Sequence, residues 1–121
     1  MIRFLMNDIL TFHERLDKAT CIRDLGLIES AVNSPFQTFG GNFLYPEVAE
    51  RAARLFYGLV KNHGFIDGNK RVALHAMELY LLLYGFKLNC SQAERVSVTM
   101  KVAASKMTAE EFLDWLKTKI D

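Results

Sequence analysis

Apolar residues recur at spacings of three and four along most of this chain, which is the pattern of amphipathic helices. The pattern predicts six helices, over residues 8–18, 25–33, 46–62, 69–84, 96–106 and 112–120. Residues 79–83 are apolar nearly all round, which indicates that the fourth helix is surrounded by the others. We therefore expect an all-α fold, a compact bundle of about six helices.

Residues that favour helix ends support these boundaries. The expected helix starts carry capping or first-turn residues, namely Asn7, Asp24, Pro46, Ser91 with Glu94, and Thr108 with Glu111. Pro35 is expected to stop the second helix, and Gly85 the fourth through a left-handed residue. No internal repeat, low-complexity tract or linker interrupts the pattern, so residues 1–121 are predicted to form a single domain.

Residues 36–45 differ from the helices on either side, because they are aromatic and prone to form strands around a Gly-Gly pair. Two structures fit this pattern equally, a short β-hairpin or flap, and an aromatic loop tucked against the core. A hairpin beside a reactive site has an exposed strand edge that can accept an extended target segment. The residues predicted to dock such a target are Phe39, Gly40, Gly41 and Asn42.

The composition argues against several classes of function. The chain has 121 residues and a formal net charge of +1, so it lacks a broad electrostatic footprint for nucleic acid or an anionic membrane. Its longest apolar run is far shorter than a membrane span needs, and its first residues do not resemble a signal peptide. Two cysteines suit neither a metal site nor a disulfide framework. We expect a cytoplasmic protein with reduced thiols, no membrane and no direct nucleic-acid partner.

The candidate chemistry lies between the two strongest helical patterns, in the stretch His63-Gly64-Phe65-Ile66-Asp67-Gly68-Asn69-Lys70-Arg71. A helix starts at Gly68 or Asn69, and the first N–H groups of a helix have no partner within it and attract anions. Lys70 and Arg71 place two cations on this first turn, where the helix dipole disfavours them unless an anion is bound. These groups predict a phosphate site.

The same stretch supplies candidates for a metal ligand and a general base. Asp67 is the only carboxylate in the loop, and a carboxylate beside a phosphate is a typical ligand of Mg²⁺. His63 precedes the loop, and an imidazole titrates near neutral pH, which suits a base. Phe65 is assigned to packing. A plain joint between two helices, with a solvated Lys-Arg pair, has a similar sequence, so these residues alone leave both interpretations open.

The two other histidines are assigned supporting roles. His13 is predicted to be a surface or packing residue, and His75 a packing residue or an indirect support of the site. Together with His63 they lack the spacing of a metal-centred hydrolase. A DNA-binding helix-turn-helix is disfavoured, because the chain has too few phosphate-contacting cations at the joint.

The pattern His63-x-Phe65-x-Asp67-Gly68-Asn69-Lys70-Arg71 resembles the signature of the Fic/Doc family, in the form used by death-on-curing (Doc) toxins of type II toxin–antitoxin systems. Further segments also resemble Doc-type sequences, namely residues 22–31, 39–41, 44–46 and 57–62. The resemblance covers roughly residues 5–90. It implies a compact all-helical domain in which the motif joins two central helices and a flap lies beside it.

The resemblance also implies transfer of part of a nucleoside triphosphate to a protein hydroxyl. The adenylylating Fic branch has Gly where this chain has Lys70, and Arg where it has Leu74, which cannot hold the outer phosphates of ATP. The Doc branch with this Lys resembles a kinase. It delivers the γ-phosphoryl group of ATP to a threonine of elongation factor Tu and so arrests translation. Adenylyl transfer and a catalytically inactive interaction module are the alternatives.

Carried over to this chain, the family motif implies roles for its residues. The implied catalytic residues are His63, Asp67, Lys70 and Arg71, and the implied phosphate-binding residues are Gly68, Asn69, Lys70 and Arg71. His63 would take the proton from the target hydroxyl, and Asp67 would position Mg²⁺. ATP and Mg²⁺ are thus the implied cofactors. The implied partner is a cognate antitoxin whose C-terminal segment folds into an apolar groove.

Two features depart from the family pattern. The connection over residues 17–21 is shorter than the Gly-rich segment of many relatives and has Cys21 in place of a Gly, which would alter how a partner docks at that edge. Gly64 stands where a Pro is common. We expect Gly64 to add flexibility next to His63.

Overall fold

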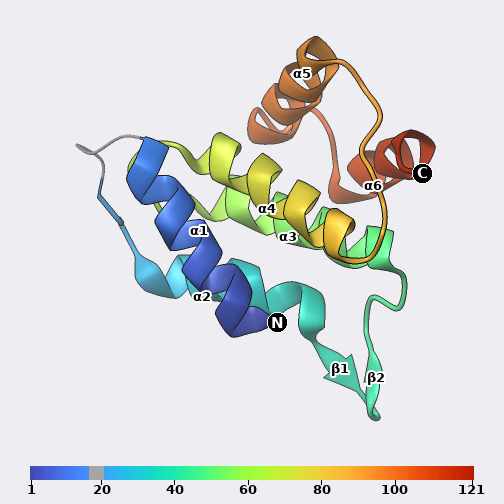
Figure 1. Ribbon diagram of the computed structural model, residues 1–121, viewed down its shortest axis with the longest axis horizontal. Coiled ribbons are helices and arrows are strands. Elements are labelled where there is room, and N and C mark those ends of the chain that lie inside the picture. The colour runs from blue at the N-terminus through green and yellow to red at the C-terminus, as the bar shows by residue number, and fades with distance from the viewer. Residues whose placement is uncertain (17–20) are drawn as a thin grey trace.

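The computed structural model describes residues 1–16 and 21–121, which are arranged as Figure 1 shows. The α-helices are α1 (Ile2–Leu16), α2 (Leu25–Asn33), α3 (Val48–Asn62), α4 (Asn69–Leu83), α5 (Gln92–Ala103) and α6 (Ala109–Lys119). A short 3-10 helix, η1 (Ser34–Phe36), follows α2, and a hairpin of β1 (Thr38–Phe39) and β2 (Asn42–Phe43) precedes α3. The predicted all-α fold with six helices is confirmed for the described residues.

The helices α3 and α4 lie side by side at the centre, and the other helices pack around this pair (Figure 1). α3 contacts α2, α4, α5 and α6, because its apolar residues repeat at helical spacing and are buried. The hydrophobic core contains side chains from all six helices. The prediction that the fourth helix is surrounded by the others is only partly right, since Leu82 and Leu83 are 60% and 48% exposed. None of the described helices is long and apolar enough to span a membrane.

Three of the predicted helix caps are present. The side chains of Asp24 and Ser91 each accept a hydrogen bond from the backbone N–H three residues further on. The predicted capping box of Ser91 and Glu94 is only half formed, because the Glu94 side chain contacts Trp115 and Lys119 instead. Thr108 and Glu111 form the complete capping box. Pro35 lies in η1, directly after the end of α2, as its fixed φ and missing N–H favour. α5 starts directly after its cap and runs over residues 92–103, four residues earlier than predicted at its start.

Two other predicted helix starts are wrong. α1 begins at Ile2, and Asn7 lies in its interior, because Leu5 extends the buried stripe toward the N-terminus. α3 begins at Val48, since the Glu50 side chain accepts a hydrogen bond from the Glu47 N–H at 3.0 Å and so caps the helix there. Pro46 therefore lies outside α3. The predicted end of the first helix, at residue 18, falls outside the described residues.

Residues 38–43 form the predicted hairpin rather than a tucked aromatic loop. The two strands pair in an antiparallel register that sets Thr38 opposite Phe43. The turn residues Gly40 and Gly41 have φ values of 59° and 83°, and a two-residue type I′ turn requires positive φ at both positions. Phe39 is 84% exposed at the end of β1. The hairpin therefore extends into solvent.

The hairpin lies far from the motif between α3 and α4. It leads into the N-terminus of α3, whereas the motif follows the C-terminus of this 15-residue helix, which spans about 22 Å. Figure 1 shows β1 and β2 at the opposite end of the α3–α4 pair. Arg51 holds the hairpin base there, donating to the Tyr45 and Pro46 carbonyls at 2.9 Å and to the Tyr80 hydroxyl at 2.8 Å. The expected flap beside the motif is therefore wrong, and target docking at residues 39–42 stays a prediction.

The contact between α5 and α6 depends on the ionised form of Glu94. The pKa of Glu94 lies below its ordinary value, because its carboxylate accepts a hydrogen bond from the Trp115 indole and contacts Lys119. The stabilisation is therefore present above the ordinary glutamate pKa and is lost as the pH falls through the lowered value. We expect Glu94→Gln to lower the Tm at neutral pH and to leave it unchanged at pH values below the lowered pKa of Glu94.

Thermal unfolding followed by circular dichroism across pH measures this difference. Glu14→Gln is the control, because Glu14 is exposed on α1. A Tm loss for Glu94→Gln that is equally large at acidic and neutral pH would contradict the assignment.

Candidate active site

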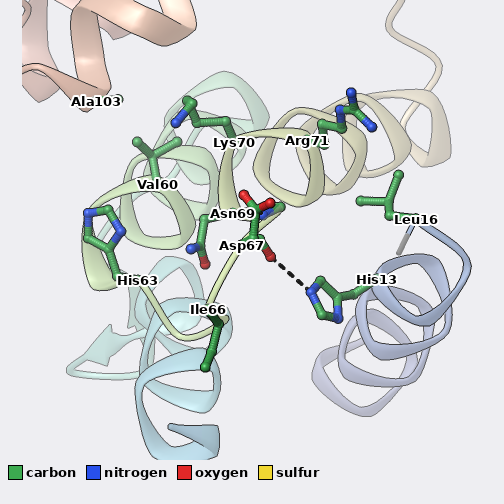
Figure 2. Close-up of a pocket in the computed structure, with 11 residues that line it drawn as sticks. His13, Leu16, Val60, His63, Ile66, Asp67, Asn69, Lys70, Arg71 and Ala103 are labelled. Atoms are coloured by element: carbon green, nitrogen blue, oxygen red, sulfur yellow. Dashed lines mark hydrogen bonds between the residues drawn. The ribbon is translucent and has the colours of Figure 1, made fainter. Parts of the chain in front are cut away.

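A pocket of about 520 Å³ lies where α1, α3, α4 and α5 meet the loop between α3 and α4 (Figure 2). The motif residues that line it are His63, Ile66, Asp67, Gly68, Asn69, Lys70 and Arg71, and the other described residues that line it are His13, Leu16, Val60 and Ala103. The structure thus brings together all the residues predicted to be catalytic or to bind phosphate. The four residues of the predicted docking flap do not line this pocket.

His63 ends α3 in a strained conformation. It is the C-cap of the helix and has φ 50° and ψ 49°, in the left-handed region. A non-glycine residue in this region costs on the order of 1 kcal/mol or more and persists only when its surroundings hold it. Arg23 does so, because its guanidinium donates to the His63 carbonyl at 2.7 Å and to the Asn62 carbonyl at 3.2 Å. The exposed imidazole is thereby directed to the edge of the pocket.

The chain just before α2 runs along the motif loop and holds its backbone. The N–H groups of Arg23 and Asp24 both donate to the Gly64 carbonyl, at 2.8 and 3.0 Å. The Ile66 N–H donates to the Cys21 carbonyl at 3.1 Å, and an isolated β-bridge lies between these contacts. Cys21 is thus part of the support of the loop through its backbone. The rest of the unusually short connection, residues 17–20, lies outside the described residues.

Gly64 packs too closely against α2 to serve as a flexible element. A Cβ atom on Gly64 would lie 2.3 Å from Cγ1 of Ile28 and 3.2 Å from the Ile28 nitrogen. Real Cβ contacts do not come so close, so only glycine fits here without a shift of α2. The expectation that Gly64 loosens the chain beside His63 is therefore wrong. Its role is to let the loop approach α2 closely.

A Gly64→Ala substitution is expected to lower the free energy of unfolding by about 1–3 kcal/mol, because the added methyl overpacks the contact with Ile28. In an Ile28→Ala background the same substitution should cost less, since the clashing side chain is absent. Urea unfolding of the two single variants and the double variant measures this coupling. If the losses of unfolding free energy in the two single variants simply add in the double variant, the clash with Ile28 is not the cause of the destabilisation by Gly64→Ala.

Asp67 and Gly68 form the entrance to α4, that is, the two residues directly before the helix. Gly68 is the N-cap with φ 87°, and its N–H donates to Oδ1 of Asp67 at 2.8 Å. Gly68 has no side chain to accept from the first N–H groups of α4, and these groups have no other acceptor within the described residues, so they are suited to an anion. Lys70 and Arg71 are exposed on the same turn, and neither forms an ion pair within the described parts of the chain. The turn therefore combines free backbone donors with two uncompensated cations.

Asn69 is turned away from solvent and closes the loop. It is 9% exposed, its Oδ1 accepts from the Phe65 N–H at 3.0 Å, and its Nδ2 donates to the Phe65 carbonyl at 2.8 Å. Phe65 is itself 2% exposed, in agreement with its predicted packing role. Because both ends of the Asn69 amide are used by the loop, we expect Asn69 to contribute its backbone N–H rather than its side chain to phosphate binding.

His13 lies in the site, and the sequence did not predict this position. It is 4% exposed, lines the pocket, and donates from Nε2 to the Asp67 carbonyl at 2.9 Å. Its predicted packing role is right, since its ring stacks on Phe65 with centroids 3.8 Å apart, but its contact with the motif was not foreseen. The signal available in the sequence was its place four residues after Ile9, on the buried stripe of α1, where a polar side chain needs a partner.

The donor set suits Mg²⁺ only together with phosphate oxygens. Among the described residues that line the pocket, Asp67 is the one carboxylate. Within the described residues, no cluster of three or more His, Cys, Asp or Glu side chains could hold a metal ion by itself. Mg²⁺ is commonly bound by one or two carboxylates plus substrate phosphates and water, so a single Asp67 beside a helix start that could hold phosphate fits this cation.

The chain is similar to known proteins in two comparisons. The chain is 40% identical over 67 residues to Toxin Doc of Mycolicibacterium smegmatis, an alignment that covers 55% of this chain and 52% of the relative. The chain thus aligns with about half the length of that curated relative. The Fic/DOC family model matches residues 3–81, which include nearly all of α1, all of α2, α3 and the motif, and most of α4. The match spans well over half of the sequence, and the chain therefore belongs to the Fic/DOC family.

Proposed function

We propose that this protein is a Doc-type toxin that transfers the γ-phosphoryl group of ATP to a threonine hydroxyl of elongation factor Tu and thereby arrests translation. The observation that carries the proposal is the pocket in which His63 and Asp67 lie together with Lys70 and Arg71 on the first turn of α4. Membership of the Fic/DOC family and the similarity to Toxin Doc support the toxin class. The transferred group is inferred from the motif residues, and the target from the resemblance of the motif to that of Doc toxins.

Each motif residue has a task in this reaction. His63 accepts the proton of the target hydroxyl while that oxygen forms a bond to the γ-phosphorus, and the bond from the γ-phosphorus to ADP breaks. Lys70, Arg71 and the first N–H groups of α4 stabilise the negative charge on the transferring group and on the leaving ADP. Asp67 would hold Mg²⁺, which supplies further charge neutralisation on the phosphates.

Two positions favour phosphoryl over adenylyl transfer. Lys70 lines the pocket, so the cation that distinguishes the Doc branch is available to the phosphates. Leu74 lies one turn further along α4, packs against the core and does not line the pocket. A leucine has no donor and no charge, so nothing at that position can hold the outer phosphates in the orientation that delivers AMP.

A cognate antitoxin is part of the proposal. A segment that folds on binding needs an apolar surface, and one is present where the hairpin meets the end of α4. Phe43 and Tyr84 are both 46% exposed there, and the Arg51 guanidinium lies 4.7 Å from the ring centroid of Phe43 and 5.9 Å from that of Tyr84. Leu44, Leu82 and Leu83 are exposed as well. We propose this surface as the place where the antitoxin segment binds.

The target is tested in a translation extract. The extract is incubated with the purified protein, Mg²⁺ and ATP, the protein is then removed, and synthesis of a reporter is followed. We expect synthesis to stop and to resume when fresh elongation factor Tu is added. If synthesis never stops, the toxin proposal is wrong, and if fresh factor does not restore it, the target is a different protein. His63→Ala is the control that should leave synthesis unaffected.

A further inference from the structure

We propose that His13 is a positioning residue that fixes the peptide plane at the entrance to α4, and with it the phosphate-binding turn. The identity of the ligand of this turn rests on the proposed function, but the positioning of the turn by His13 does not. His13 belongs to α1, whereas the residues it contacts lie 54 positions later, at Asp67, and nearby in the motif loop. Figure 2 shows His13 and His63 on opposite sides of Asp67, with the hydrogen bond from His13 to the Asp67 carbonyl.

The hydrogen bond determines which imidazole nitrogen carries the proton. A carbonyl oxygen can only accept, so the 2.9 Å contact requires a proton on Nε2 of His13. The ring is 4% exposed, and it stacks on Phe65 with centroids 3.8 Å apart and planes 20° apart. Both the direction of the donor and the plane of the ring are therefore set by packing.

This contact orients the next backbone donor. A trans peptide is planar, with its C=O and N–H groups pointing in opposite directions. When His13 holds the Asp67 carbonyl on the α1 side, the Gly68 N–H must point away from α1, and it is found 2.8 Å from Oδ1 of Asp67. The Asp67 carboxylate and the first turn of α4 thus take their orientation from a single peptide plane.

The ring of His13 also limits how far the turn can move. A Cβ atom placed on Gly68 would lie 3.3 Å from Cδ2 and 3.6 Å from Nε2 of His13, so the turn rests directly on the imidazole edge. Gly68 has φ 87° and no side-chain cap, and its backbone hydrogen bonds are local, to Asp67 and Val72. The imidazole of His13 therefore supports the turn on the side that faces α1.

The chain contains a matched control for this role. His75, on α4, likewise bonds through Nε2, at 2.6 Å to Oδ2 of Asp8, and likewise stacks on an aromatic ring, that of Phe12, at 3.9 Å. These contacts of His13 and His75 each attach α1 to another segment of the chain. His75 does not line the pocket, as its predicted packing role implies. Substitution of His75 thus reproduces the loss of packing without the loss of positioning.

Three variants separate the effect of the His13 N–H donor from the effect of its ring. His13→Phe keeps a ring but removes the N–H, His13→Gln keeps an N–H donor but removes the ring, and His75→Phe is the control. The first readout is hydrogen exchange of the hydrogen-bonded amides of the loop and the turn, those of residues 65, 66, 68 and 72, in the ligand-free protein. We expect exchange in His13→Phe to be about tenfold faster, because the loss of one hydrogen bond makes the locally open state about tenfold more populated. His13→Gln and His75→Phe should exchange at close to the wild-type rate in this segment.

The second readout is transfer from ATP. We expect His13→Phe to lower kcat about 10- to 100-fold with a much smaller effect on the KM for the target, because a displaced turn misplaces the reacting groups. His13→Gln should recover most of this loss. Equal exchange and equal kcat in His13→Phe and His75→Phe would overturn the proposal. A wild-type protein that transfers nothing would instead refute the proposed function, and the exchange measurement would still decide the role of His13.

Discussion

Replacement of His63 by alanine is expected to lower the rate of transfer to the target by about 10²–10⁴-fold, the usual contribution of a positioned general base. The loss should be confined to chemistry, because the imidazole is exposed and the contacts of Arg23 are made to the backbone of residues 62 and 63. The variant should therefore keep its Tm and its affinity for Mg²⁺ and ATP. Initial rates, thermal unfolding and calorimetric nucleotide binding measure the three quantities.

The control for this prediction is His75→Ala. It removes a histidine that is paired with Asp8 outside the pocket, so it tests whether loss of any histidine slows the reaction. We expect its rate to stay near that of the wild type. If His63→Ala keeps full activity, the base is another group and the assignment of His63 is refuted.

Replacement of Asp67 by asparagine is expected to lower the rate by about 10²–10³-fold, since charge stabilisation by a bound metal is worth several kcal/mol. Asparagine retains an Oδ1 acceptor for the Gly68 N–H, so the entrance to α4 should stay intact. What is lost is the negative charge that would hold Mg²⁺. The concentration of Mg²⁺ that gives half the maximal rate should rise accordingly.

Asp24→Asn is a matched control for this prediction. Asp24 also stands before a helix and also accepts a backbone hydrogen bond through Oδ1, from Leu27 at 3.2 Å, but it does not line the pocket. Its substitution should leave the Mg²⁺ dependence unchanged. An Asp67→Asn variant with the wild-type Mg²⁺ dependence would exclude Asp67 as the metal ligand.

Local patterns in the sequence were sufficient to predict the helices and most of the motif. Apolar spacing identified six helices, and short-range chemistry placed the caps at Asp24, Ser91 and Thr108. The motif residues could be grouped in advance because they lie on one loop and the helix turn after it. Their convergence on one pocket follows from that short spacing.

Features that depend on distant contacts were not predictable in the same way. The hairpin itself follows from the Gly-Gly turn, but its position at the far end of α3 depends on the length of that helix and on the contacts of Arg51. Gly64 looks flexible in the sequence, and only the approach of Ile28 shows that it fills a tight contact. His13 is another case, since its partner lies 54 positions away. In each case the missing information was which segments meet in three dimensions.

The position of the transferred phosphorus tests the central claim most directly. Purified elongation factor Tu is incubated with this protein and Mg²⁺, in parallel reactions with ATP labelled at the γ- or at the α-phosphate, and the labelled factor is then measured. The proposed mechanism predicts label on the factor from the γ-phosphate only, and none with the His63→Ala variant. Label from the α-phosphate would contradict it, because it would mean that Lys70 and Leu74 do not exclude adenylyl transfer.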